Sequence, residues 1–480
     1  MRNLKSLFVQ GAAVLAATLT FTMSGGASAP AGMTYAIRGA KIVTVSGATI
    51  DNGTVLIRDG VIQAVGTSVT VPVDAIVTDG AGLTVYPGFI DLMSGAPLGE
   101  TAPAAGPGGG RGGGRGGGGN DPAFSSREEA ERAKREAILR PDYQAASNLV
   151  ESSDALASMA QAGITSVLAV PSQGIFKGQS ALVNTMYPPD DPMISTVAEY
   201  RRGLAVVKAP VAQHVNIGGR GGGTGYPNSL LGTIAFTRQG FLDAKWQRDA
   251  TAIYEKNGGV GPRPLVEPSL DALKPALAKE VPTAFDANQA REIDRSLIMA
   301  NDFGLDPIIV GGAEAHKRIE DLQKAKARVI LGVNFQAGGG GGGRGGGGAA
   351  SGQNMQQAIL EATKTAARLA EAGITFGFTG GGVLQPSAFM TNVGRTIKDG
   401  GLPAATALRA LTLDAARVAG AADRLGSIDQ GKIANLVVIE GELFDSASRV
   451  RHVFIDGRPI DMGSAAPAGG TGRGGRGGGR

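Results

Sequence analysis

Predicted strands and helices alternate along most of this 480-residue chain, and this alternation constrains the fold more than any other feature of the sequence. Runs rich in β-branched residues predict buried strands at residues 164–170, 281–286, 307–310, 328–333 and 374–378. Patterns typical of helices lie between them, at residues 145–162, 229–256, 290–303, 313–325 and 355–372. Repeated alternation predicts an α/β protein with a parallel sheet. We expect a TIM-like (β/α)8 barrel, with an open doubly wound sheet as the alternative.

Both ends of the chain show β patterns instead. Residues 34–85 contain short β runs separated by hairpin signals such as Asp59-Gly60, which predicts a small β domain. After a last predicted helix over 402–418, β patterns return up to residue 455. Within the alternating region, residues 175–186 and 193–207 are expected to form strands of an inserted lobe.

The N-terminus is typical of a secretory signal peptide. Arg2 and Lys5 precede an apolar stretch over 7–23, and small residues follow it. We expect residues 1–31 to be removed, with cleavage after Ala29 or Ala31. An uncleaved anchor is the alternative, but the apolar stretch is short and interrupted by polar residues. The expected location is secreted or periplasmic, with no stable membrane span after cleavage. The chain has no cysteine, so its core must hold the fold without disulfides.

Glycine is unusually abundant, with 77 residues, and much of it lies in three Gly/Arg-rich loops and a tail. These segments are residues 106–120, 218–225, 338–348 and 463–480, and we expect the tail to be disordered. In a barrel, the first and third loops would overhang the catalytic face, so Arg111 and Arg344 are candidates for binding an anionic or peptide partner. Simple low-complexity insertion is the alternative. Arg-Gly runs bind RNA inside cells, but export argues against a nucleic-acid partner.

Two stretches resemble the amidohydrolase superfamily, in particular its imidazolonepropionase-like branch. Residues 86–95 read Tyr-Pro-Gly-Phe-Ile-Asp-Leu-Met-Ser-Gly, similar to the family's first barrel strand. Residues 401–417 and 425–438 resemble its closing signature, and residues 453–459 resemble the last strand of its β domain. This resemblance covers most of 34–462. It implies a barrel over 87–419, a composite β-sandwich domain from residues 32–86 and 420–462, assembly into oligomers, and hydrolysis of C–N bonds by metal-activated water.

The residues at the family's metal-binding positions do not match this implied activity. The family's ligands would fall on Met93, Gly95, Asp286, Gly311 (or Gly312) and Gly381. Methionine and glycine are poor ligands for zinc, and a single carboxylate cannot build a zinc site. We therefore expect no metal cofactor, and zinc only if the site is rebuilt. Lys208 is a weak candidate for the family's carbamylated lysine.

A rebuilt site could use other polar residues, because hard cations accept carboxylates. The candidates are Asp91, Glu199, Asp286, Glu314 and His214. Asp286 and His214 are the candidate catalytic residues, while Asp91, Asp286 and Glu314 are candidate binding residues. Asp91 is also expected to orient backbone at the end of its strand. His316 and His452 are expected to be structural.

No nucleophile triad, phosphate loop or dinucleotide fingerprint offers another mechanism. The leading hypothesis is an exported pseudoenzyme that acts as the partner of an intact paralogue, in a homo- or hetero-oligomer, or as a binder of amide or peptide ligands. One alternative is an active hydrolase of a cyclic amide or dipeptide with a rearranged site. Another is a structural protein of the cell envelope.

Overall fold

The computed structural model describes residues 33–99, 126–150, 154–186, 206–218, 227, 229–335, 352–382, 385–445, 447–460 and 462. The predicted signal peptide, the Gly/Arg-rich loops apart from Gly218, and the C-terminal tail lie outside these residues.

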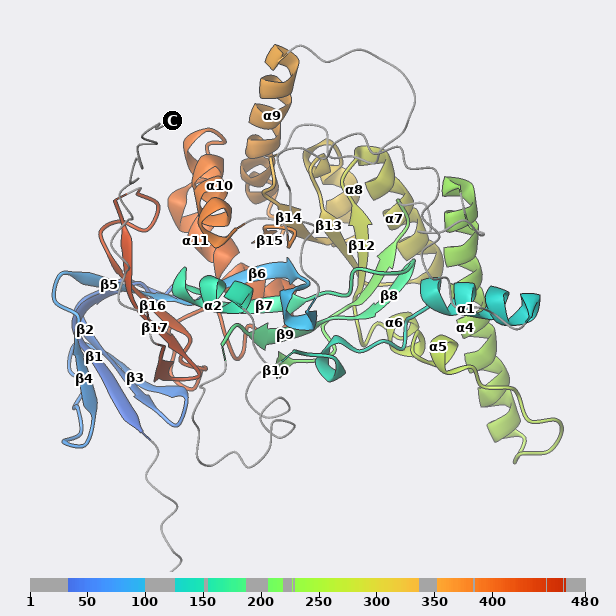
Figure 1. Ribbon diagram of the computed structural model, residues 1–480, viewed down its shortest axis with the longest axis horizontal. Coiled ribbons are helices and arrows are strands. Elements are labelled where there is room, and N and C mark those ends of the chain that lie inside the picture. Colours follow the sequence, from blue (N-terminus) through green and yellow to red (C-terminus); the bar gives the residue numbers. More distant parts are fainter. Residues whose placement is uncertain are drawn as a thin grey trace, which may run out of the picture.

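The two ends of the chain meet in one eight-stranded sheet, drawn in blue and red in Figure 1. Its strands are β1 (Thr34–Ile42), β2 (Ile50–Arg58), β3 (Val61–Gly66), β4 (Ile76–Asp79), β5 (Leu83–Pro87), β16 (Leu436–Glu440), β17 (Arg449–Ile455) and β18 (Arg458–Pro459). The order is β18-β17-β16-β5-β1-β2-β3, and β4 pairs with β1. The two ends join where β16 pairs antiparallel with β5, with Leu436 opposite Pro87. A separate β-sandwich domain stays a prediction.

The middle of the chain forms two further sheets. The four-stranded sheet has the order β10-β9-β7-β6, from β6 (Phe89–Ser94), β7 (Ile164–Ala169), β9 (Ala181–Asn184) and β10 (Val206–Lys208). The six-stranded sheet has the order β15-β14-β13-β12-β11-β8, from β8 (Phe176–Gln179), β11 (Gln213–Asn216), β12 (Thr283–Ala287), β13 (Pro307–Gly311), β14 (Arg328–Gly332) and β15 (Phe376–Thr379). Strands β11 to β15 are parallel to one another, which confirms the predicted parallel sheet, and β8 is added antiparallel to β11 at its edge.

The expectation of an inserted lobe at residues 175–186 is wrong. β8 pairs with β11 in the larger sheet, and β9 pairs with β7 in the smaller one. Only Ser180 separates β8 from β9, and its amide donates to the Ala212 carbonyl at 3.0 Å. The segment is a single extended run shared by the two sheets. In the other half of the predicted lobe, residues 193–207, residues 206 and 207 belong to β10, which pairs with β9 in the smaller sheet, and residues 193–205 lie outside the described part of the chain.

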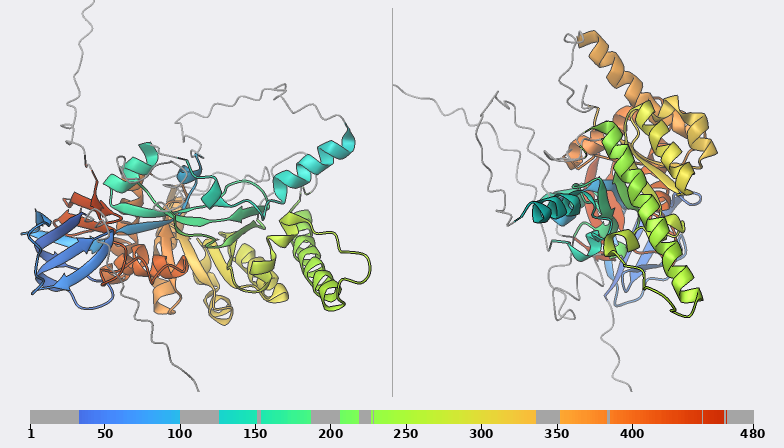
Figure 2. Two further views of the ribbon diagram at one scale, coloured as in Figure 1. Left: turned by 90° about the horizontal axis from the view of Figure 1, so that it is seen from below. Right: turned by 90° about the vertical axis from the view of Figure 1, so that its right-hand side faces the viewer.

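The helices, shown from two further directions in Figure 2, include a group that lies along one side of the central strands, α7 to α11. The α-helices are α1 (Arg127–Ile138), α2 (Asp154–Gln161), α4 (Leu230–Lys256), α5 (Pro268–Asp271), α6 (Lys274–Leu277), α7 (Ala290–Phe303), α8 (Ile319–Lys324), α9 (Gly352–Glu371), α10 (Pro386–Lys398), α11 (Ala404–Leu411) and α12 (Leu413–Val418). The short 3-10 helices are η1 (Ala96–Leu98), η2 (Ala145–Ser147) and η4 (Ala315–Lys317).

The predicted helix over 402–418 is broken at Thr412, whose backbone leaves the helical region with φ −129° and ψ −93°.

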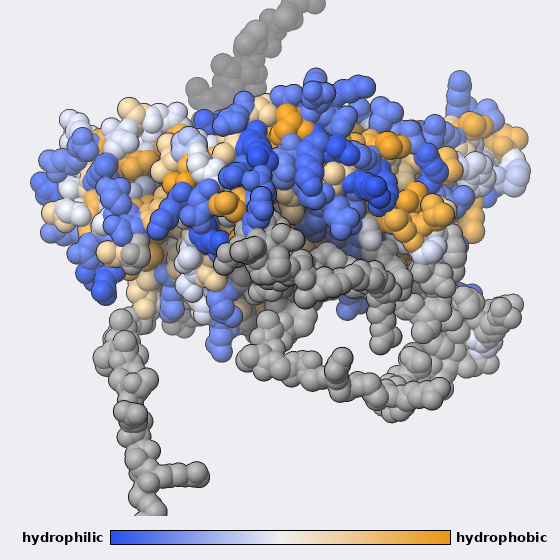
Figure 3. All heavy atoms as spheres, turned by 90° about the horizontal axis from the view of Figure 1, so that it is seen from above, coloured by the Kyte–Doolittle hydropathy of each residue, from blue (hydrophilic) through white to orange (hydrophobic). Residues whose placement is uncertain are grey.

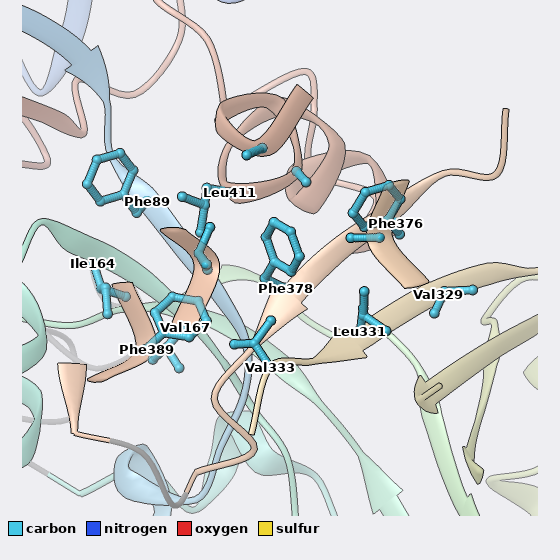
Figure 4. Packing of buried hydrophobic residues seen from close by; sticks show 14 of the residues in the cluster. Phe89, Ile164, Val167, Val329, Leu331, Val333, Phe376, Phe378, Phe389 and Leu411 are labelled. Atoms are coloured by element: carbon cyan, nitrogen blue, oxygen red, sulfur yellow. The ribbon is translucent and has the colours of Figure 1, made fainter. Parts of the chain in front are cut away.

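Aromatic and branched side chains fill the space between these helices and the strands, as Figure 4 shows. Phe378 on β15 is fully buried, lies edge-on to Phe376 with ring centroids 5.5 Å apart, and belongs to the same cluster as Phe389 of α10 and Leu411 of α11. Burial of such side chains holds the helices on the sheet.

None of the described helices combines the length and apolar character that a membrane span requires. The face seen in Figure 3 is mostly hydrophilic, with apolar residues in small groups.

We predict that Phe378→Ala lowers the free energy of unfolding by roughly 3–5 kcal/mol, because it leaves a cavity in this cluster. Leu231→Ala, at a side chain 78% exposed on α4, should change it by less than about 0.5 kcal/mol. Urea unfolding followed by circular dichroism compares the two variants. Equal losses would contradict the assignment of Phe378 to the core.

Candidate functional site

Three polar side chains gather on one side of the six-stranded sheet. Lys177 comes from β8, His214 from β11 and Asp286 from β12. In the parallel register His214 lies opposite Ala284, two residues before Asp286, so the two side chains point to the same face. Ala284 and Ala212 on this face pack in a cluster with Ile308 and Leu182, so the polar residues border an apolar interior.

Lys177 and Asp286 form an ion pair in these surroundings. The ammonium of Lys177 donates to Asp286 Oδ2. Lys177 is only 4% exposed, whereas the side chain of Asp286 is 24% exposed. The other carboxylate oxygen, Asp286 Oδ1, is buried and has no hydrogen-bond partner among the described residues. A buried lysine requires such a counter-charge, because an uncompensated ammonium would be costly to remove from water.

His214 is fully buried beside this pair. Its Nε2 lies 2.9 Å from Ser180 Oγ, which accepts a hydrogen bond from the amide of Ala212 and donates one to the Ala212 carbonyl. Because the Ser180 hydroxyl proton is already used, this pattern favours the tautomer in which Nε2–H donates to Ser180. His214 Nδ1 is then a bare acceptor, and it finds no partner in the described parts of the chain.

Burial, and secondly the charge of Lys177, lowers the pKa of His214 to about 3. The imidazole is therefore neutral at physiological pH. Because the folded protein holds the proton less well than the unfolded chain, whose histidine pKa is about 6.5, this residue's contribution to stability is complete above that pH and is lost as the pH falls.

We predict that the wild-type protein loses roughly 2 kcal/mol more stability than His214→Gln between pH 7 and pH 5. The comparison uses the pH dependence of the free energy of unfolding, so a constant offset caused by the substitution does not matter. Parallel curves for the two proteins would show that His214 is not buried as a neutral group.

Three of the predicted metal-ligand positions, Gly311, Gly312 and Gly381, have backbone conformations suited to glycine. Gly311 has φ +100°, and a Cβ there would lie 2.3 Å from Asn288 Oδ1. Gly381 has φ +68° and Gly312 has φ +60°, also in the left-handed region. A histidine or aspartate at these positions would be strained. The residues at these positions therefore do not fit the metal site that the resemblance implies.

The other replaced positions lie on and after β6. Met93 is partly buried against the apolar interior, and Gly95 is the N-cap of η1. No set of three or more His, Cys, Asp or Glu side chains placed to hold a metal ion occurs among the described residues.

Asp91 orients backbone at the end of its strand, as the sequence predicts. Its Oδ1 accepts hydrogen bonds from the amides of Met93 at 3.2 Å and Gly380 at 3.3 Å, which ties β6 to the end of β15. Burial raises the pKa of Asp91 to about 6, although hydrogen bonds from Thr379, Met93 and Gly380 oppose the rise. This carboxyl group holds its proton more tightly in the folded protein than in the unfolded chain.

For a carboxyl group with a raised pKa, the associated stability is present at low pH and is lost as the pH rises from its unfolded value through about 6. We predict that Asp91→Asn removes this loss. Relative to the variant, the wild-type protein should lose about 1 kcal/mol between pH 5 and pH 7. Denaturant titrations at pH 5 and pH 7 measure the free energy of unfolding of both proteins. If the stability difference between wild type and variant were the same at the two pH values, the claim that Asp91 is a buried carboxyl group with a raised pKa would be contradicted.

Glu314 is held in a different environment. Its carboxylate accepts a hydrogen bond from the amide of Ala290 at 2.8 Å and pairs with Lys317 at 2.6 Å. These contacts, led by Lys317, lower the pKa of Glu314. Glu314 lines a cleft of about 510 Å³ between η4 and α9, together with His316 and Glu361. Glu314 therefore forms an ion pair of its own and does not take part in the Lys177–Asp286 pair.

The remaining predicted residues are dispersed. His316 Nδ1 lies 2.9 Å from Thr365 Oγ1. His452 on β17 lies opposite Val438 in the eight-stranded sheet. Neither histidine belongs to the group formed by Lys177, His214 and Asp286. Lys208 on β10 donates to the carbonyl of Gly420 at 2.6 Å. Arg111, Arg344 and Glu199 lie outside the described residues, and their roles stay predictions.

Of the predicted candidates, the structure brings together Asp286 and His214, both beside Lys177. The sequence analysis missed Lys177 and Ser180. A possible signal was the isolated lysine in the otherwise uncharged run Gly174–Asn184, where a buried charge requires a partner elsewhere.

Comparison with known proteins gives three findings. Residues 382–460 match the model of the amidohydrolase family. No curated protein sequence matches the chain. Among solved structures, an amidohydrolase from Thermotoga maritima MSB8 is similar with a TM-score of 0.69 and 22% identity, over 89% of this chain and 99% of that one. A Xaa-Pro dipeptidase with bound methionine is similar with a TM-score of 0.51 and 15% identity, over 89% of this chain and 100% of that one.

At these identities the structural likeness concerns the fold, and it implies a fold of the TIM-barrel type. Together with the family match, it confirms the predicted resemblance to the amidohydrolase superfamily.

Proposed function

We propose that this amidohydrolase-superfamily protein is a hydrolase-like but non-catalytic homologue that binds a ligand or a protein partner. The observation that carries this proposal is the ion pair between Lys177 and Asp286, because Asp286 is the one predicted ligand position that still holds a metal-binding residue. A carboxylate already neutralised by an ammonium attracts a divalent cation poorly. The positive φ values of Gly311 and Gly381 support the same conclusion.

The unsatisfied atoms beside the pair indicate which ligand such a site could take. Asp286 Oδ1 and His214 Nδ1 are acceptors that need donors, and the Lys177 ammonium has donors beyond the one given to Asp286. The charges of Lys177 and Asp286 cancel, and His214 is neutral, which favours an uncharged ligand. An amide or peptide group offers both an N–H and a carbonyl oxygen, so it matches these requirements.

The proposal places this cluster in a closed barrel. The two central sheets approach each other at both sides, through the run from β8 to β9 and through the contact of Asp91 with Gly380. Closing at these two points would give a TIM-like barrel, capped by a composite β domain, in which the run from β8 to β9 is antiparallel to its neighbours β11 and β7. Asp286 would then lie at the carboxyl end of its strand, where barrel proteins place their sites.

The cellular part of the proposal rests on the sequence. A signal peptide over residues 1–31 would direct the chain to the periplasm or the exterior. There it would assemble with itself or with an intact amidohydrolase paralogue, without nucleic acid and without a membrane span after cleavage.

A second candidate function is a hydrolase of cyclic amides or dipeptides with a rearranged site. It is favoured by the presence of Asp286 and His214 beside the same lysine, both with an unpartnered atom. This alternative requires an activity that is abolished both by Asp286→Ala and by a metal chelator.

We predict that the purified mature protein contains no stoichiometric metal. Elemental mass spectrometry is applied after dialysis against a weak chelator and again after loading with zinc or manganese. An intact amidohydrolase treated in parallel is the positive control. One or two tightly bound ions per chain, accompanied by amide hydrolysis, would contradict the non-catalytic proposal and support the rearranged site.

A further inference from the structure

We propose that Lys177 is a built-in cation, whose ammonium permanently fills the place that a dissociable cation would take between Asp286 and His214. The inference rests on the proposed function in that it assumes a metal-free site. It goes further in that it assigns to Lys177 the positive charge that a metal ion would supply.

Lys177 lies on β8, which is the neighbour of β11 in the six-stranded sheet. Strand β8 runs antiparallel to β11, with Phe176 opposite Val215 and Gly178 opposite His214. Lys177, between these two residues, is therefore next to His214 across one pair of strands, and Asp286 follows on the next strand. The lysine reaches Asp286 across β11, and the contact joins residues 109 positions apart in the sequence.

The positive charge of Lys177 compensates the negative charge of Asp286. The Lys177 ammonium donates to Asp286 Oδ2, and its charge acts on the neutral imidazole of His214. The carboxylate of Asp286 borders an apolar interior and therefore requires a compensating positive charge. Lys177 provides this charge through a covalently attached side chain that is almost completely buried, so it cannot dissociate.

This arrangement differs from an ordinary surface ion pair, and the chain offers a matched comparison. Lys317 and Glu314 also form an ion pair, but their side chains are 50% and 37% exposed. Water screens the exposed pair, so removing one member has little effect. Removing one member of the buried pair leaves an uncompensated charge, so the two buried residues should be strongly coupled.

A double-mutant cycle on the full mature chain tests the inference. The variants are Lys177→Met, Asp286→Asn and their combination, with Lys317→Met, Glu314→Gln and their combination as the matched exposed pair. We expect each buried single variant to lower the melting temperature, and the buried double variant to melt above Lys177→Met. The exposed pair should show additive, small shifts. Additive shifts for the buried pair, or failure of the double variant to fold, would overturn the inference.

Chemical rescue provides a second test. Lys177→Ala removes the atoms of n-propylammonium, so this cation should raise the melting temperature of the variant, whereas 1-propanol of similar size should not. Lys177→Ala/Asp286→Asn should not respond, because it lacks the acceptor charge. Equal effects of the cation and the alcohol would overturn the built-in cation.

The two proposals can fail separately. Metal uptake away from Asp286 and His214, accompanied by amide hydrolysis and with intact coupling between Lys177 and Asp286, contradicts the proposed function alone. Additive effects of the two substitutions in a protein that takes up no metal contradict the built-in cation alone.

Discussion

The charge of Asp286 is the constraint on which the interior of the central sheets depends. A carboxylate in these apolar surroundings requires a compensating positive charge, and Lys177 supplies it from a neighbouring part of the sheet. The pairing of β8 with β11 brings the lysine to Asp286 across β11. His214 is neutral because it is buried and, secondly, because the ammonium of Lys177 carries a positive charge nearby.

The fold around this pair is similar to that of a solved amidohydrolase, whereas Asp286 is the one predicted metal-ligand position that holds a metal-binding residue. Strands β11 to β15 are parallel to one another, and strands from residues 34–87 and 436–459 share one sheet. At Gly311 and Gly381 the positive φ values would strain any residue that carries a metal-binding side chain. Restoring metal ligands would therefore require local rearrangement of these loops.

Local sequence patterns could predict much of the fold, because the bounds of helices and strands depend largely on residues that are close together in the sequence. Helix α7 coincides with the predicted range 290–303, and Ser229 caps α4 by accepting a hydrogen bond from the amide of Gly232. The break at Thr412 and the placement of β8 depend on tertiary contacts, which the local pattern does not contain. Asp286 was predicted from the family resemblance, because it falls on a metal-ligand position. The pairing of strands was needed to show that Lys177, 109 positions away in the sequence, is its partner.

The most direct test of the central claim is diffraction at the zinc absorption edge from crystals of the wild-type protein grown with excess zinc. The account predicts electron density for the Lys177 ammonium beside Asp286 and no anomalous peak within bonding distance of Asp286 or His214. An anomalous peak between these two residues, with Lys177 displaced, would contradict the claim that a lysine has taken the place of the metal.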